Sequence, residues 1–121
     1  MIQSHRDLVV WQKAMDMVVQ VYQLAQHFPS SETYRLTAQV TRSAASVPAN
    51  IAEGHGRGPN KKEYAHFLSI AKGSLMETET FLILAIRLQY VNTTQAQPTL
   101  DLIVEISKML TTIRRRLRPE P

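Results

Sequence analysis

Residues 43–58 read SAASVPANIAEGHGRG and combine helix-forming residues, an internal proline and a glycine-rich exit. Apolar residues recur at spacings of three and four through this region, as on one face of a helix, at Leu36, Val40, Ala44, Val47 and Ile51. The pattern passes through Pro48, which has no N–H for the carbonyl of Ala44 and crowds it. We therefore expect one helix over residues 32–53, kinked at Pro48 and ended by Gly54.

Small residues stand just before this proline, at Ser43, Ala44, Ala45 and Ser46. They allow a neighbouring helix to approach closely, and their hydroxyls can bind backbone groups that the proline frees. Gly73 lies in the middle of a later helical pattern, where a glycine costs about 1 kcal/mol relative to alanine. We expect Gly73 to pack closely against residues 43–46.

Apolar periodicity predicts three further helices, over residues 7–26, 60–88 and 98–117. Asn60 and Glu63 have the spacing of a capping box, and Pro98 suits the first turn of a helix. A chain of 121 residues is one domain by length, and short connections favour antiparallel neighbours. The prediction is an all-α fold, a single antiparallel up-down-up-down four-helix bundle over residues 1–121.

The first helix carries two apolar stripes. One consists of Leu8, Trp11, Met15, Val18, Tyr22 and Ala25, and the other of Val10, Ala14, Met17, Val21 and Leu24. A helix in a lone bundle needs only one such stripe. We expect the first stripe to face the core, and Val10, Met17, Val21 and Leu24 to bind another subunit of a homo-oligomer.

The amino-acid composition narrows the classes of protein to which this chain can belong. With no cysteine there is no disulfide and no thiolate site. The longest apolar run, residues 81–86, is far shorter than the ~18 residues of a membrane span, and charged residues precede any apolar run at the N-terminus, so we expect a cytoplasmic protein. The net charge of +4 and the pI of about 9.7 suit a polyanionic partner, although many proteins without one share them.

Glu63 and His66 have the Glu-x-x-His spacing of di-iron bundles, but that site needs a second such pair, which the sequence lacks. The glycines at 54, 56 and 58 join two helices, whereas nucleotide-binding loops lead from a strand into a helix. We read a structural turn there, with weak anion binding at the following helix start as the alternative. We expect no metal and no cofactor.

Asn50 and Glu53 lie one turn apart near a helix end, where a carboxylate opposes the helix dipole unless a cation or donor meets it. Arg57 follows four residues later, and Arg42 or Lys72 could reach the same place in the fold. We favour a hydrogen-bonded staple over a catalytic or recognition carboxylate. No Ser/His/Asp set stands on neighbouring turns, so we expect no enzyme.

Four arginines end the last helix, at positions 114, 115, 116 and 118. A solvated helix end is one interpretation, because cations favour a helix C-terminus. In a ring of subunits, however, copies of the cluster would sum to a positive field that attracts phosphates. The nucleic-acid interpretation assigns the main contact to Arg114, Arg115, Arg116 and Arg118 and a secondary patch to Lys61 and Lys62. Because the aromatic residues sit on apolar stripes, such binding would be independent of sequence.

Several separated segments, in this order, are similar to one known family. They are residues 7–14, 28–29, Gln39, 47–54, 56–57, 63–64, 67–68, 73–75 and Glu77. With a signature that includes Pro48, Asn50, Glu53, Gly54 and Arg57, the chain resembles the 23S-rRNA intervening-sequence proteins over roughly residues 6–90. Thr78 departs from the aliphatic residue that is usual there, and Pro59-Asn60 from the usual Ser or Thr.

The resemblance implies a four-helix bundle that forms pentameric rings. Relatives are encoded in intervening sequences of ribosomal RNA genes, and a similar protein, the accessory variability protein, assists the reverse transcriptase of a retroelement. The leading hypothesis is therefore a non-enzymatic homo-oligomer that binds RNA, DNA or a nucleic-acid-handling protein. The alternative is a purely structural or protein-binding module without a nucleic-acid role.

Overall fold

The computed structural model describes residues 2–118, and four long helices account for most of them. After a short 3-10 helix at His5–Asp7 the elements are α1 (Val9–Ala25), a second 3-10 helix (Ser30–Glu32), α2 (Leu36–His55), α3 (Lys61–Arg87) and α4 (Thr93–Arg116). The described residues contain no strand, which confirms an all-α fold of four helices. Residues 1 and 119–121 of the predicted domain lie outside the described part.

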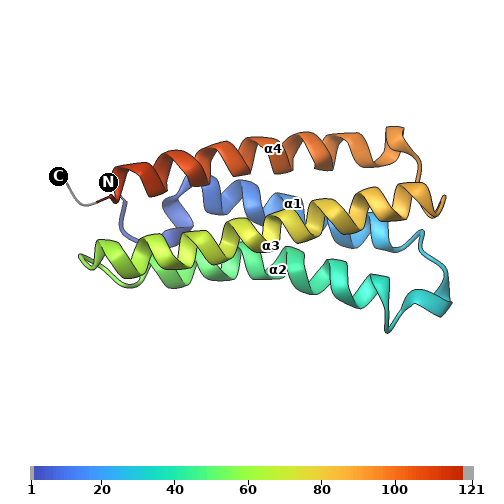
Figure 1. The fold of residues 1–121 in the computed structure, drawn as a ribbon, viewed down its shortest axis with the longest axis horizontal. Coiled ribbons are helices and arrows are strands. Elements are labelled where there is room, and N and C mark those ends of the chain that lie inside the picture. The colour runs from blue at the N-terminus through green and yellow to red at the C-terminus, as the bar shows by residue number, and fades with distance from the viewer. Residues whose placement is uncertain (1, 119–121) are drawn as a thin grey trace.

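The four helices lie alongside one another along the long axis of the molecule (Figure 1). α2 packs against α1 and α3, and α4 packs against α3 and α1. The start of α1, the end of α4 and the turn between α2 and α3 lie at one end of the molecule, on the left in Figure 1. The connections from α1 to α2 and from α3 to α4 lie at the opposite end.

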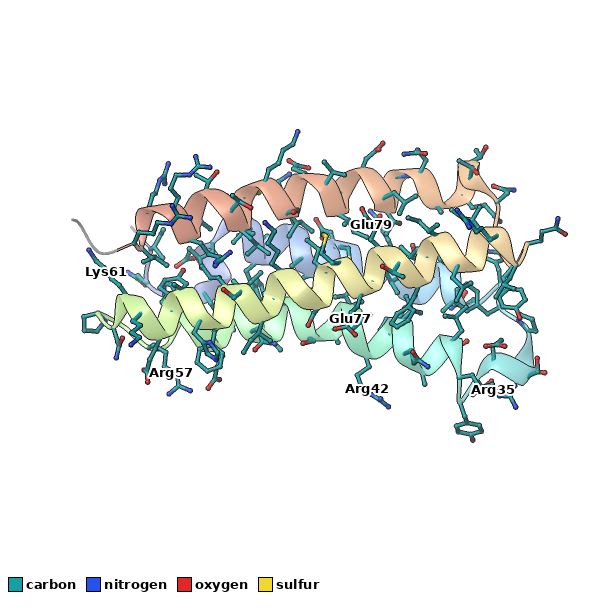
Figure 2. The ribbon with its side chains drawn as sticks, viewed as in Figure 1. Arg35, Arg42, Arg57, Lys61, Glu77 and Glu79 are labelled. Atoms are coloured by element: carbon teal, nitrogen blue, oxygen red, sulfur yellow. The ribbon has the colours of Figure 1, made fainter. Side chains whose placement is uncertain are left out.

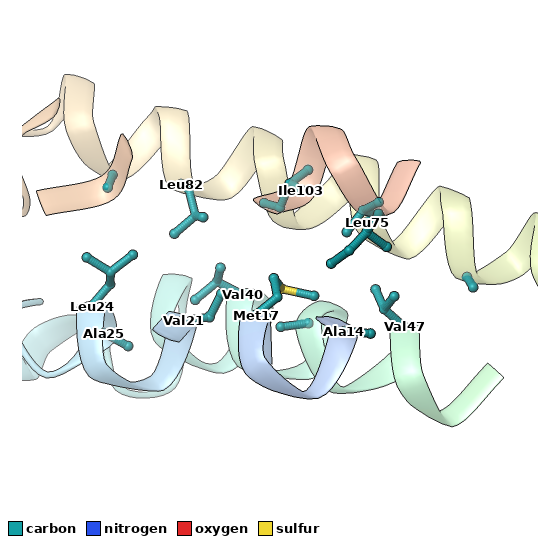
Figure 3. Close-up of a cluster of buried hydrophobic side chains, with 14 of the residues drawn as sticks. Ala14, Met17, Val21, Leu24, Ala25, Val40, Val47, Leu75, Leu82 and Ile103 are labelled. Carbon is teal, nitrogen blue, oxygen red and sulfur yellow. The ribbon is translucent and has the colours of Figure 1, made fainter. Parts of the chain in front are cut away.

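The core corrects the assignment of the two stripes on α1. Val10, Met17, Val21 and Leu24, predicted to bind another subunit, are at most 7% exposed and belong to the chain's own core. Figure 3 shows Met17, Val21 and Leu24 in that core. From the stripe expected in the core, Met15 and Tyr22 are instead exposed. α1 packs on both α2 and α4, and in this position the second stripe faces the core. On the α4 side, Lys13 Nζ lies 2.8 Å from Glu105 Oε1, and Thr99 Oγ1 donates to Gln20 Oε1 at 2.8 Å.

α2 and α3 meet along a row of small and hydroxyl-bearing residues that we call the α2–α3 seam: Ser43, Ser46, Asn50, Gly54, Ser74 and Thr78. The hydroxyls of Ser43 and Thr78 lie 2.8 Å apart, and those of Ser46 and Ser74 lie 2.9 Å apart. Each is a hydrogen bond between the two helices, so the small residues before Pro48 do pack against α3.

Glycine packing differs from expectation at two positions. A Cβ on Gly54 would lie 3.0 Å from Phe67 Cβ and 3.1 Å from the backbone oxygen of Tyr64, so α3 approaches α2 closely there. Gly73, expected to make the close approach, is exposed, and a Cβ there would meet nothing within 4 Å. The close contact of the seam therefore depends on Gly54, which lies inside α2 and does not end it.

Two helices begin elsewhere than expected. α2 begins at Leu36, because the residues before it form a 3-10 helix whose Glu32 carboxylate accepts the N–H of Leu36 at 3.0 Å. α4 begins at Thr93, where Asn92 and Gln95 form a complete capping box. Pro98 is consequently inside α4. The capping box of Asn92 and Gln95, and not Pro98, therefore marks the start of α4.

Candidate nucleic-acid interface

Basic residues gather at the end of the molecule that holds the α2–α3 turn, which we call the basic end. It comprises residues 2–17, 46–74 and 105–118, and these contain eleven basic and five acidic residues. The remaining described residues contain three basic and four acidic ones. The excess positive charge of the described chain therefore belongs to one end, where Arg57 and Lys61 lie in Figure 2.

A cavity of about 540 Å³ opens at this end between the start of α3 and the last turns of α4. We call it the basic cavity; its lining residues are Lys61, Lys62, Ala65, Thr111, Arg114, Arg115, Leu117 and Arg118. Five of these eight side chains are cationic and none is acidic. The two basic patches predicted separately from the sequence thus form one site.

Arg116 does not belong to this site. It lines a second cavity of about 430 Å³ between α1 and α4, together with Leu8, Val9, Val10, Lys108, Met109, Thr112 and Ile113. The reason is helical geometry, because consecutive residues are rotated by about 100° and Arg116 lies on the far side of α4 from Arg114 and Arg118. The arginine cluster is therefore divided between two faces.

Among the described residues, no carboxylate pairs with the five cations of the basic cavity. The ion pairs in the described part of the chain join Lys13 to Glu105 and Arg57 to Glu53, and neither involves a residue of this cavity. Within that part, Nε of Arg114 is buried without a hydrogen-bond partner. At the edge of the cavity, Lys72 Nζ donates to Thr111 Oγ1 at 2.8 Å. Positive charge in the cavity is thus available to a ligand.

The start of α3 adds backbone donors to the same place. The side chain of Asn60 accepts the N–H of Glu63 at 3.1 Å, which confirms the predicted cap. The first N–H groups of the helix, on Lys61 and Lys62, have no partner within the helix, and the dipole places positive potential there. This arrangement favours an anion.

None of the five signature residues lines the cavity. Asn50 Nδ2 donates to the backbone oxygen and the Oγ of Ser46, at 2.8 and 2.9 Å, and so belongs to the seam. Of the three cations considered for Glu53, Arg57 is the one that meets it, with Nη2 2.7 Å from Oε1. The Arg57 guanidinium also lies over the Phe67 ring, 4.8 Å from its centre. These contacts hold the α2–α3 turn.

Aromatic side chains pack inside the same turn. The rings of His55 and Tyr64 meet edge to face, with centroids 6.0 Å apart, and burial raises the pKa of the Tyr64 hydroxyl. His66 lies against Phe67 rather than beside a set of metal ligands. Across the described residues, no three His, Cys, Asp or Glu side chains group as metal ligands would.

An exposed apolar row on α1, which we call the α1 outer face, is the other unusual surface. Met15, Val19 and Tyr22 follow one another at helical spacing and are 41%, 55% and 53% exposed. From the sequence, Met15 and Tyr22 were expected in the core, and their exposure is the reason that this row was missed.

Among the described helices, none has the length and apolar character needed to cross a bilayer.

Comparison with known proteins gives a family and a fold. The model of the 23S rRNA-intervening sequence protein family matches residues 6–112. A crystal structure of a protein of unknown function from the S23 ribosomal protein family of Bacteroides thetaiotaomicron is 28% identical, with a TM-score of 0.80 over 88% of this chain and 99% of that one. Among curated proteins, none matches this chain.

Proposed function

The chain belongs to the 23S rRNA-intervening sequence protein family, and from this premise we propose that it is a non-enzymatic helical module that binds nucleic acid through its basic end. The basic cavity is the observation that carries the proposal. Five cations, from the start of α3 and the C-terminal end of α4, line it, and no carboxylate in residues 2–118 pairs with them. Phosphates are the common polyanionic groups that such a set attracts.

Binding would use phosphates rather than bases. Arginine guanidiniums donate two parallel hydrogen bonds to phosphate oxygens, and Arg114, Arg115 and Arg118 are placed to do so together. The aromatic residues of the basic end, such as Tyr64 and Phe67, are partly buried against neighbouring side chains. They offer no row of free rings for base stacking, so we propose binding that is independent of sequence.

The test is a salt titration of binding to mixed-sequence RNA and DNA. We expect affinity to fall steeply with salt, and the triple change Arg114→Gln, Arg115→Gln and Arg118→Gln to lower the log–log slope for single strands by about two units, at about 0.7 for each phosphate that is no longer bound. Arg116→Gln removes the same kind of charge from outside the cavity and should lower the slope less than any single cavity variant. Affinity that does not respond to salt would contradict the proposal.

We also propose that the chain forms a homo-oligomer. The family resemblance implies that this oligomer is a closed ring of five. The α1 outer face supports assembly, because Val19 is 55% exposed and covering it would contribute roughly half of the 1.5–3 kcal/mol that full burial of such a side chain contributes. A ring would also repeat the basic end and so strengthen weak phosphate contacts. Light scattering should give a multiple of 13.7 kDa for the parent chain and a smaller particle for Val19→Glu. A soluble monomer at micromolar concentration would overturn this assembly.

The second candidate is a protein-binding module with no nucleic-acid role. The same α1 outer face favours it, since an exposed apolar row is typical of protein interfaces. The salt titration separates the two candidates, because this module would bind neither RNA nor DNA. As the chain has no cysteine, we place it in the cytoplasm, which cell fractionation would test.

We propose further that the helices follow an up-down-up-down order and that α2 bends at Pro48. The packing of each helix on the next, and of α4 on α1, supports the order, and a proline within α2 supports the bend. Ser46→Cys with Ser74→Cys tests the pairing in a chain without other cysteines, since the parent hydroxyls are 2.9 Å apart. Rapid disulfide formation is expected. An experimental structure with a straight α2 would contradict the bend.

A further inference from the structure

We propose that the basic cavity binds the terminal phosphate of a nucleic-acid strand, a phosphomonoester, in preference to the phosphodiesters within the strand. The inference rests on the proposed function and assigns a ligand group to the same site. Three features of the cavity support it: its shape, its charge and the arrangement of its donors.

The shape is that of a pocket. Its volume of about 540 Å³ lies within the range of about 300–1,000 Å³ that small-ligand sites occupy. It lies where α3 begins and α4 ends, at the end of the molecule where Figure 2 shows Lys61. A group at the end of a strand can enter such a recess and be surrounded by it, whereas a continuous backbone touches a surface from one side.

The five positive charges of the cavity favour a ligand that carries more than one negative charge. Lys61, Lys62 and the three arginines repel one another, and the ion pairs of the described chain relieve none of them. A phosphodiester supplies one negative charge. A phosphomonoester supplies about 1.5 to 2 at pH 7 and three free acceptor oxygens. The terminal group therefore offsets more of the repulsion within the same volume.

The donors come from several directions, as three acceptor oxygens require. Arg114 lines the cavity with its guanidinium, whose Nε is buried and has no partner among the described residues. Lys61 and Lys62 contribute ammonium groups and the free N–H groups of the first turn of α3. Arg115 and Arg118 approach from the end of α4. A diester, with two free oxygens, would leave more of these donors unused.

The remaining lining residues suit a nucleoside without reading its base. Ala65 and Leu117 are apolar, and the Thr111 hydroxyl is engaged by Lys72 Nζ and by the backbone oxygen of Ser107, to which it donates at 3.0 Å. Apolar contact with the terminal sugar or base adds affinity without hydrogen bonds to base edges. The preference should accordingly depend on the terminal phosphate and not on the terminal base.

The experiment compares three single-stranded RNAs of one sequence that carry a 5′-phosphate, a 3′-phosphate or hydroxyls at both ends. At constant salt we expect one phosphorylated strand to bind at least about tenfold more tightly than the strand with two hydroxyl ends. A nucleoside monophosphate should compete for the site, and its potency relative to the strand identifies whether a free nucleotide or a strand end is the better ligand. Equal affinity for all three strands overturns the inference and leaves the proposed function standing. Binding of none of them overturns both.

Variants place the effect in the cavity. Arg114→Gln and Lys62→Gln should each remove most of the preference for the terminal phosphate. Arg116→Gln, in the same helical turn but lining the other cavity, should retain it, as should Arg42→Gln, an exposed change on α2 away from the site (Figure 2). Circular dichroism on heating confirms that each variant is folded. If Arg116→Gln lost the preference as fully as Arg114→Gln, the cavity would not be the binding site.

Discussion

α3 forms two contrasting contacts, the α2–α3 seam on one side and the basic cavity on the other. In the seam, hydroxyls of opposite helices bind each other and Gly54 lets the backbones approach. In the cavity, side chains of one charge face a space that remains open. The family match ends at residue 112, so the three arginines of the cavity lie beyond it, and of the five cations the two lysines lie within it. The comparison separates residues that hold the fold from residues free to bind.

The largest effect in this comparison is expected at Gly54. Gly54→Val would add side-chain atoms where a Cβ already lies 3.0 Å from Phe67 Cβ and from Tyr64 Cδ1. Since the backbone of α3 must move to accommodate them, the free energy of unfolding should fall by about 3 kcal/mol. Urea denaturation monitored by circular dichroism measures it.

Gly73 provides the matched control for Gly54. The same substitution, Gly73→Val, meets open space on the exposed side of α3. Helix propensities of valine and glycine differ by less than about 0.5 kcal/mol, so stability should hardly change. Equal losses at the two positions would show that helix propensity, and not the close approach at Gly54, determines the result.

A smaller effect is expected at Thr78, which is fully buried and binds the Ser43 hydroxyl and the backbone oxygen of Ser74. Thr78→Val keeps the shape and removes the hydroxyl, and should cost about 1 kcal/mol. In the variant, Ser43 can donate its one hydroxyl proton to the backbone oxygen of Val40, 3.1 Å away, which limits the loss.

The double-mutant cycle with Ser43→Ala tests the pairing itself. Once Thr78 is valine, Ser43→Ala should cost less than in the parent chain, with a coupling of about 0.5–1.5 kcal/mol. Additive losses would mean that the two hydroxyls do not support each other across the seam.

The all-α class was predictable from the sequence, because the spacing of the apolar residues identifies helices directly. The direction in which a helix faces was harder to predict. The two stripes on α1 have the same spacing, and which of them is buried depends on how α1 packs on α2 and α4, helices that lie further along the chain. Long-range contacts of this kind leave no periodic pattern.

The candidate site was predictable in its residues and not in its arrangement. Basic residues at the start of one helix and at the end of another stand out in the sequence, but their union in one cavity depends on how α3 and α4 pack. The separation of Arg116 could have been predicted, since rotation by about 100° per residue places it opposite Arg114 and Arg118. Gly54 and Gly73 could not be told apart, because both lie in helical patterns and only the partner helix distinguishes them.

A still smaller effect is expected at high pH. Burial raises the pKa of Tyr64, so the folded chain keeps the phenol proton at a pH where the unfolded chain, with a pKa near 10, has lost it. This contribution to stability is complete below pH ~10 and is lost as pH rises through the pKa of the folded chain. The free energy of unfolding should fall as the pH rises above about 10, and fall less in Tyr64→Phe.

Tyr90 provides the control, because desolvation and the nearby Glu32 carboxylate raise its pKa too. Tyr90→Phe removes that second tyrosine and should leave the contribution of Tyr64 in place. If the free energy of unfolding falls at alkaline pH as much in Tyr64→Phe as in the parent chain, the α2–α3 turn is not the source of that fall.

The smallest effect on stability is expected in the basic cavity. Replacing Arg114, Arg115 and Arg118 by glutamine removes cations that the C-terminal end of the α4 dipole stabilises. It also removes the repulsion between these arginines and the two lysines of the cavity. These terms oppose each other, so the free energy of unfolding should change by less than about 1 kcal/mol. Urea denaturation and light scattering should therefore match the parent while affinity for RNA falls. A variant that unfolds, or whose oligomer dissociates, would show that the arginines stabilise the assembly as Gly54 stabilises the seam, and the contrast between the two sides of α3 would no longer hold.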